Sequence, residues 1–161
     1  MRPPVRRIGL VLHVGASVGW LGAVSASLAL GVVGLAATDP GVVRGAYLVL
    51  EPVGWWTLLP FSVAGLVTGL VQSLGTSWGL ARHYWVLVKL VMNLFATGVL
   101  LLYMQTLGML ADMARDPGVA TAALRSASPV VHAAAAIGLL LVALVLSVYK
   151  PRGATPWTGR T

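Results

Sequence analysis

The sequence contains no cysteine and little charge, and both shortages narrow what the protein can be. Without cysteine the chain can form no disulfide, thiolate metal cluster, thiolate haem ligand or covalent c-type haem, and it has no thiol nucleophile. Only 9% of the residues are charged, against about 25% in soluble domains, whereas 58% are hydrophobic. These proportions predict an integral membrane protein with little mass outside the bilayer.

Acidic residues are the scarcest charged group. Four Asp and Glu face eleven Lys and Arg, which gives a net charge of +7. In a soluble protein this excess would suggest a nucleic-acid partner. Here the basic residues flank apolar runs and form no patch, so we expect the lipid bilayer as the partner and no nucleic acid.

Long apolar runs dominate what remains. The first, residues 8–37, contains no Asp, Glu, Lys or Arg, and it is too long for the core of a signal peptide. About 20 apolar residues suffice to cross a bilayer as a helix. The sequence therefore predicts an all-α integral membrane bundle of four transmembrane helices in a single domain, 1–161. The expected helices are about 8–37, 53–74, 84–110 and 129–149, followed by a basic tail, 150–161.

Two prolines and two tryptophans mark the second span. We expect Pro52 to end a helical piece over 41–52, which is either a short interfacial helix or an outer extension of the span. Pro60 should kink the span. Trp55 and Trp56 should lie at its start, in an aromatic belt. A further short helix is expected within 119–125.

Glycines recur at spacings that suit close contact between helices. Gly65 and Gly69 are four residues apart in the second span, and Gly15, Gly19 and Gly22 lie in the first. Small residues at such positions let two helix backbones approach each other. We therefore interpret all five as packing positions.

The distribution of charge predicts the orientation. With four spans, both termini and the loop between the second and third spans share one side. That side carries eight of the basic residues and no acid, whereas the other side carries three basic residues and all four acids. Because basic loops stay in the cytoplasm, we expect both termini to be cytoplasmic, which in a bacterial cell is the inner side of the inner membrane.

Ionisable and polar side chains inside the spans indicate one candidate site. His13 and Lys89 each lie roughly 8 Å above the inner end of an outward-running helix, and Ser17 and Asn93 follow them by one turn. The two inward-running helices bring further polar residues to this depth. The expected inner-leaflet pocket comprises His13, Ser17, Gln72, Lys89, Asn93 and Tyr149.

An imidazole and an ammonium group at one depth suit a haem b or porphyrin-like cofactor. His13 would ligate the iron, and Lys89 would pair with a propionate or act as an alternative ligand. The same pair equally suits a proton relay or an anionic lipid headgroup. In a further interpretation both residues merely mark the inner interface, with Lys89 extending to the headgroups.

The other two histidines lie elsewhere. His132 is near the outer end of the fourth span, roughly 20 Å from the depth of His13, so one haem cannot join them. It is either an interfacial cap or buried hydrogen-bonding histidine, or part of an outer site with Glu51, Tyr47 or Tyr103. His83, at the edge of the inner loop, is expected to contact lipid or to supply a second ligand from the cytoplasmic side.

Three segments resemble known membrane proteins. LHVGASVGWLGAV, GLVQSLGTSWGLARHYWVLVKL and LSVYKPRG resemble an uncharacterised family of small four-helix integral membrane proteins of high-GC bacteria. This resemblance covers nearly the whole chain and implies the fold rather than an activity.

A more distant resemblance is to the HemJ-type protoporphyrinogen oxidases and the CopD-like membrane proteins. The HemJ type has His-x6-Trp in its first helix, Trp-x3-Lys-Leu at the start of a later helix and a final Lys-Pro. These motifs match His13 with Trp20, Trp85 with Lys89-Leu90, and Lys150-Pro151. The resemblance implies a haem b ligand at His13, a functional lysine at Lys89, and Trp20 and Trp85 as pocket walls. The polar Asn-Glu-x-Pro segment of that family has no counterpart here.

Three functional hypotheses follow. The favoured one is a haem-binding membrane protein with a redox or haem-handling role. The second is a non-enzymatic accessory or structural subunit, or a homo-oligomer, that acts through helix packing. The third is a copper or proton transporter, although the sequence has no Met or His cluster and no carboxylate within a span.

Overall fold

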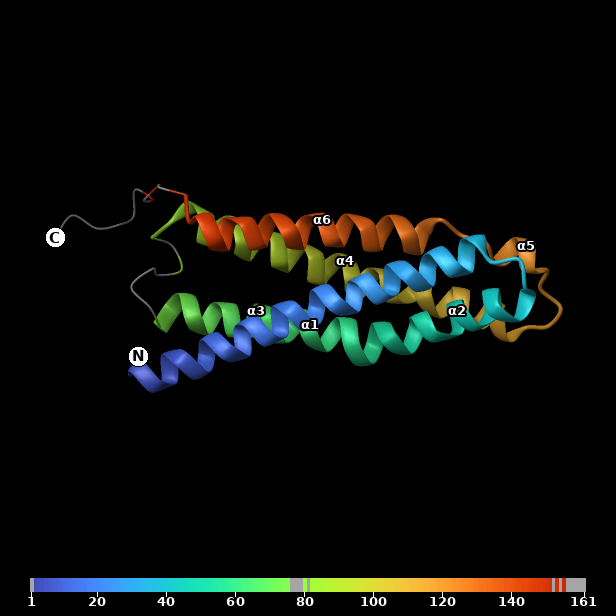
Figure 1. Ribbon diagram of the computed structural model, residues 1–161, viewed down its shortest axis with the longest axis horizontal. Coiled ribbons are helices and arrows are strands. Elements are labelled where there is room, and N and C mark those ends of the chain that lie inside the picture. The colour runs from blue at the N-terminus through green and yellow to red at the C-terminus, as the bar shows by residue number, and fades with distance from the viewer. Residues whose placement is uncertain (1, 76–79, 81, 152, 154, 156–161) are drawn as a thin grey trace.

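The computed structural model is a bundle of long helices, as the sequence predicts (Figure 1). It describes residues 2–75, 80, 82–151, 153 and 155; the turn at 76–79 and most of the tail lie outside the described residues. The elements are α1 (Pro3–Ala36), α2 (Pro40–Val53), the π-helical turn η1 (Gly54–Leu58), α3 (Leu59–Gly75), α4 (Tyr84–Arg115), α5 (Thr121–Leu124) and α6 (Ser128–Tyr149).

Four helical stretches of the described chain are long and apolar enough to cross a membrane. They are Pro3–Ala36, Pro40–Gly75, Tyr84–Arg115 and Thr121–Tyr149. α1 begins earlier than expected, at Pro3, because proline is well suited to the first turn of a helix. α4 continues past residue 110 to Arg115, and the short helix expected within 119–125 is α5.

The predicted break at Pro52 is wrong. α2, η1 and α3 form one continuous helical stretch, so residues 41–52 are an outer extension of the second span. The turn after Pro52 is π-helical, with the N–H of Leu59 donating to the carbonyl of Gly54. Such a turn lets a helix continue through a local disruption of its hydrogen bonds. The tryptophans at 55 and 56 lie in this turn, within the stretch rather than at its start.

Three of the spanning stretches are longer than a bilayer requires. They contain 34, 36 and 32 residues, or about 48–54 Å of helix, against a hydrocarbon core of about 30 Å. The outer ends of α2, α4 and α1 meet around α5, at the end of the bundle opposite to the N-terminus of α1 (Figure 1). A buried cluster there contains Val43, Tyr47, Leu50, Met104, Leu107, Leu110, Ala114 and Leu124.

Charged side chains at the α5 end bind to protein groups. Arg115 pairs with Glu51 and Asp112, each at 2.6 Å. Arg44 donates to three backbone carbonyls at and beyond the end of α4, and Arg125 donates to two at the end of α1. These contacts satisfy carbonyls that a helix end leaves without partners. The structure does not orient the bundle relative to the cytoplasm, so the predicted topology stays a prediction.

The outer surface of the bundle is apolar. Trp56 is 82% exposed, and large aliphatic side chains on every span are exposed in the same way, as expected for contact with lipid. The glycines of α1 differ from one another. A Cβ on Gly19 would lie 2.6 Å from the ring of Phe61, whereas Gly15 and Gly22 have no heavy atom within 4 Å of that position. Of these three glycines, only Gly19 permits a close helix contact.

Candidate functional site

A cavity of about 510 Å³ lies between α1, α3, α4 and α6, toward the end that holds the N-terminus of α1. Its volume is within the range of about 300–1,000 Å³ that is usual for small-molecule and cofactor sites. Six of the eight residues that the sequence identified as candidates line it: His13, Ser17, Gln72, Trp85, Lys89 and Asn93.

The imidazole of His13 is held by a threonine from the neighbouring helix. Its Nδ1 lies 3.0 Å from Oγ1 of Thr68. The Thr68 hydroxyl has one hydrogen, which it donates to the carbonyl of Ala64 at 2.6 Å. Thr68 Oγ1 therefore accepts from Nδ1–H, and in the neutral ring Nε2 keeps its lone pair. This arrangement leaves Nε2 chemically able to bind a ligand or a metal ion.

The ring of His13 packs directly against the backbone of α3. A Cβ on Gly69 would lie 3.1 Å from Cε1 of His13, while one on Gly65 would have no heavy atom within 4 Å. The sequence pattern indicates helix packing at both glycines. Gly69 instead makes room for the imidazole, and no local signal could reveal this because the ring comes from another helix.

Lys89 contacts α6 across the bundle. Its Nζ donates to Oγ of Ser147 at 2.5 Å and lies 5.7 Å from the ring centroid of Trp85. The hydroxyl of Ser147 in turn donates to the carbonyl of Ala143 at 2.8 Å, so its oxygen is oriented to accept from the lysine. These contacts hold the ammonium group beside the cavity.

Basic side chains gather along the cavity. Arg6 and Lys150 line it together with His13 and Lys89, and among the described lining residues there is no Asp or Glu. Sequence reasoning treated Arg6 and Lys150 as topology signals and did not assign them to the site. The ammonium group of Lys89, which is part-buried, favours an anionic ligand, because a charge in a low-dielectric region interacts strongly with an opposite charge.

Lys150 has an unusual backbone conformation. It follows the last residue of α6 with φ 44° and ψ 65°, in the left-handed region. Glycine is the usual residue at such a helix end, and another residue costs about 1–2 kcal/mol there. Beyond it, the tail returns toward the start of α4, where the N–H of Tyr84 bonds to the carbonyl of Gly153 and that of Thr155 to the carbonyl of Arg82.

Two polar residues of the cavity are tied to the backbone of α1. The amide nitrogen of Gln72 donates to the carbonyl of Arg6 at 3.3 Å, and the hydroxyl of Ser17 donates to that of His13 at 2.8 Å. Each side chain donates a hydrogen bond to a carbonyl of α1, which fixes its position. Both residues therefore form part of the cavity wall beside His13.

Two of the expected residues lie outside this cavity. Trp20 is 3% exposed and lines a second, separate cavity, and Tyr149 is 78% exposed and does not contribute to the lining. His132 also lines the second cavity. Of its three suggested partners it contacts Tyr103, on which it stacks with ring centroids 3.9 Å apart, whereas Glu51 pairs with Arg115.

Metal ligation by clustered side chains finds no support in the described part of the chain, where no three His, Asp or Glu residues gather. This finding does not bear on haem, which needs only one or two axial ligands.

No protein-family model, curated protein or solved structure significantly matches the chain. The function is therefore argued from the site itself.

Proposed function

We propose that the larger cavity binds a haem b or porphyrin-like cofactor and that the protein has a redox or haem-handling role in the bacterial cell membrane. The observation that carries this proposal is a histidine whose Nε2 retains a lone pair, in a cavity whose described lining contains cationic side chains and no carboxylate. Haem combines an iron that accepts imidazole with two propionates that need positive charge.

The residues present fit this group. His13 would supply the axial imidazole, and Thr68 fixes the tautomer and orientation of its ring, as partners of metal-binding histidines generally do. Lys89 and Arg6 would balance the propionates. When bound, haem iron supplies one-electron chemistry, and the residues around it adjust its reduction potential. The orientation with both termini cytoplasmic belongs to the same proposal and rests on the basic residues of that end.

An absorbance spectrum tests the proposal. The full chain, purified in detergent and titrated with haemin, should develop a Soret band with one equivalent bound. His13→Ala should abolish that band, while the matched change His132→Ala, in the other cavity, should leave it intact. Lys89→Gln should weaken haemin binding and keep the spectrum, because it removes only a counter-charge. A chain without a Soret band after haemin is supplied, or a band that survives His13→Ala, would disprove the proposal.

The alternative of a structural subunit rested on the Gly65 and Gly69 face. In this structure Gly69 contacts His13, and Gly65 is buried within the same chain. This face is therefore used inside the bundle. If partner assembly nevertheless depended on it, Gly65→Leu would disrupt a complex that His13→Ala and Lys89→Ala leave intact.

A further inference from the structure

The second cavity is small, apolar and separate from the first. It has a volume of about 160 Å³ and lies between α1, α4 and α6, with α2 and η1 contributing Leu50 and Leu58 to its lining. An engineered apolar cavity of about 150 Å³ stays dry and binds benzene. A single six-membered ring is therefore the largest rigid group that this volume suits.

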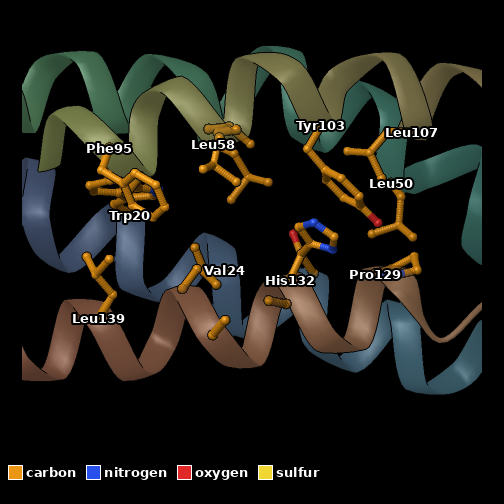
Figure 2. A pocket seen from close by; sticks show the side chains of 17 residues that line it. Trp20, Val24, Leu50, Leu58, Phe95, Tyr103, Leu107, Pro129, His132 and Leu139 are labelled. Carbon is orange, nitrogen blue, oxygen red and sulfur yellow. The ribbon is translucent and has the colours of Figure 1, made fainter. Parts of the chain in front are cut away.

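Two polar aromatic side chains, His132 and Tyr103, lie in one part of the cavity (Figure 2). Figure 2 shows His132 and Tyr103 beside each other, whereas Trp20, Phe95 and Leu139 lie together farther along the cavity. Beyond His132, Tyr103 and the Trp20 indole, Ser27 is the remaining polar residue of the lining, and its hydroxyl donates to the carbonyl of Ala23. A ligand would therefore meet apolar walls and a polar group at one end.

The contacts of His132 determine whether its imidazole offers the ligand a hydrogen-bond donor or an acceptor. Its Nδ1 lies 2.9 Å from the backbone carbonyl of Ser128, which can only accept. Nδ1 therefore carries the proton, and Nε2 of the neutral ring is a hydrogen-bond acceptor. Tyr103 stacks on the imidazole and contacts Oγ of Ser128 at 3.1 Å, so the ring is held in place from one side.

The cavity is accessible from the apolar outer surface of the bundle. Phe95, at the end away from His132, is 64% exposed, and His132 itself is exposed. Both belong to the neighbouring helices α4 and α6. A ligand that enters between these helices comes from the lipid, so it must be soluble there.

We propose that this cavity binds a lipid-soluble, uncharged phenol or hydroquinone with a single ring, whose hydroxyl donates to Nε2 of His132. The volume sets the ring size, the apolar walls exclude charge, and the acceptor on His132 selects a hydroxyl over a methyl group. The site needs no residue of the larger cavity, so it does not depend on the proposed haem function.

Two probes of nearly the same shape test this assignment. 4-Fluorophenol carries a hydroxyl group at the position where 4-fluorotoluene carries a methyl group. Binding to the full chain in nanodiscs is followed by ¹⁹F NMR, with protein-free nanodiscs as the baseline for partition into lipid. His132→Phe keeps an aromatic ring beside Tyr103 and removes the acceptor. It should weaken 4-fluorophenol binding by about tenfold and leave 4-fluorotoluene within about twofold, as expected for the loss of one hydrogen bond in apolar surroundings.

Two more variants complete the experiment. Ala136→Phe places a ring in the cavity and should abolish the binding of both probes, with a melting temperature no lower than that of the wild type because it fills a void. His83→Phe, the same chemical change at the start of α4, should alter neither affinity. Equal 4-fluorophenol affinity in the wild type and His132→Phe would overturn the proposal. So would binding that survives Ala136→Phe, or signals that match those of protein-free nanodiscs.

Discussion

Replacing Gly69 by alanine should reveal whether the imidazole of His13 is seated on α3. Alanine is favoured over glycine inside a helix by about 1 kcal/mol. The control is Gly65→Ala, one turn earlier in the same helix, where the added methyl group meets no heavy atom within 4 Å. Gly65→Ala should therefore stabilise the protein by about the full 1 kcal/mol.

At Gly69 the gain should be cancelled. The new methyl carbon would lie 3.1 Å from Cε1 of His13, whereas carbon atoms pack best at about 3.5–4.0 Å. The ring must withdraw by roughly half an ångström. Its hydrogen bond to Thr68 starts at 3.0 Å and would approach the limit of a useful contact, a loss of about 1 kcal/mol. Gly69→Ala should therefore be close to neutral.

Thermal unfolding in detergent measures the difference. About 1 kcal/mol corresponds to about 2–4 °C in a chain of this size, so Gly65→Ala should melt that much higher than Gly69→Ala. In a His13→Ala background the two substitutions should become equal, because the ring that distinguishes them is gone. Equal stabilisation by both substitutions in the otherwise native chain would refute the placement of His13 against Gly69.

Three further predictions concern the ends and the surface of the bundle. Arg44→Gln, which frees three backbone carbonyls near the end of α4, should destabilise the protein by about 2 kcal/mol, whereas Arg115→Gln, on the exposed surface, should lower the melting temperature less. Lys150→Gly should raise the melting temperature above that of Lys150→Gln by relieving the left-handed backbone, while both weaken haemin binding. Brominated lipids should quench a variant that keeps Trp56 more strongly than one that keeps Trp20, since these side chains are 82% and 3% exposed.

The four-helix fold and the shared depth of His13 and Lys89 could be predicted from the length of the apolar runs and the regular geometry of the helix. Each residue adds about 1.5 Å to a helix, so equal distances from the span ends placed His13 and Lys89 at one depth. Both line the same cavity. Trp20 shows the limit of this reasoning. It lies seven residues beyond His13 and roughly on the same face, but about 10 Å farther along the bundle, where it lines the other cavity.

What the sequence could not show depends on contacts between distant segments. Pro52 predicts a break from local chemistry, but the helix continues because residues beside it pack in a buried cluster with α4. Arg6 and Lys150 look like ordinary basic flanks, and only the approach of their helices to the cavity makes them part of it. For Lys150 that approach also requires a backbone conformation that no pattern in an aliphatic helix followed by Lys-Pro predicts.

The basic side chains at the two ends of the bundle differ in their partners, and this difference bears on the proposed ligand. At the α5 end, Arg44, Arg115 and Arg125 all bind carboxylates or helix-end carbonyls of the protein. At the other end, Arg6 and Lys89 line the larger cavity, and none of the described residues that line it is an Asp or Glu. Positive charge held beside an apolar wall is costly unless an opposite charge accompanies it. Lys89, which is part-buried and donates to the neutral hydroxyl of Ser147, bears this cost most directly. The propionates of the porphyrin proposed above would offset it, so Lys89→Gln should weaken haemin binding more than it destabilises the protein.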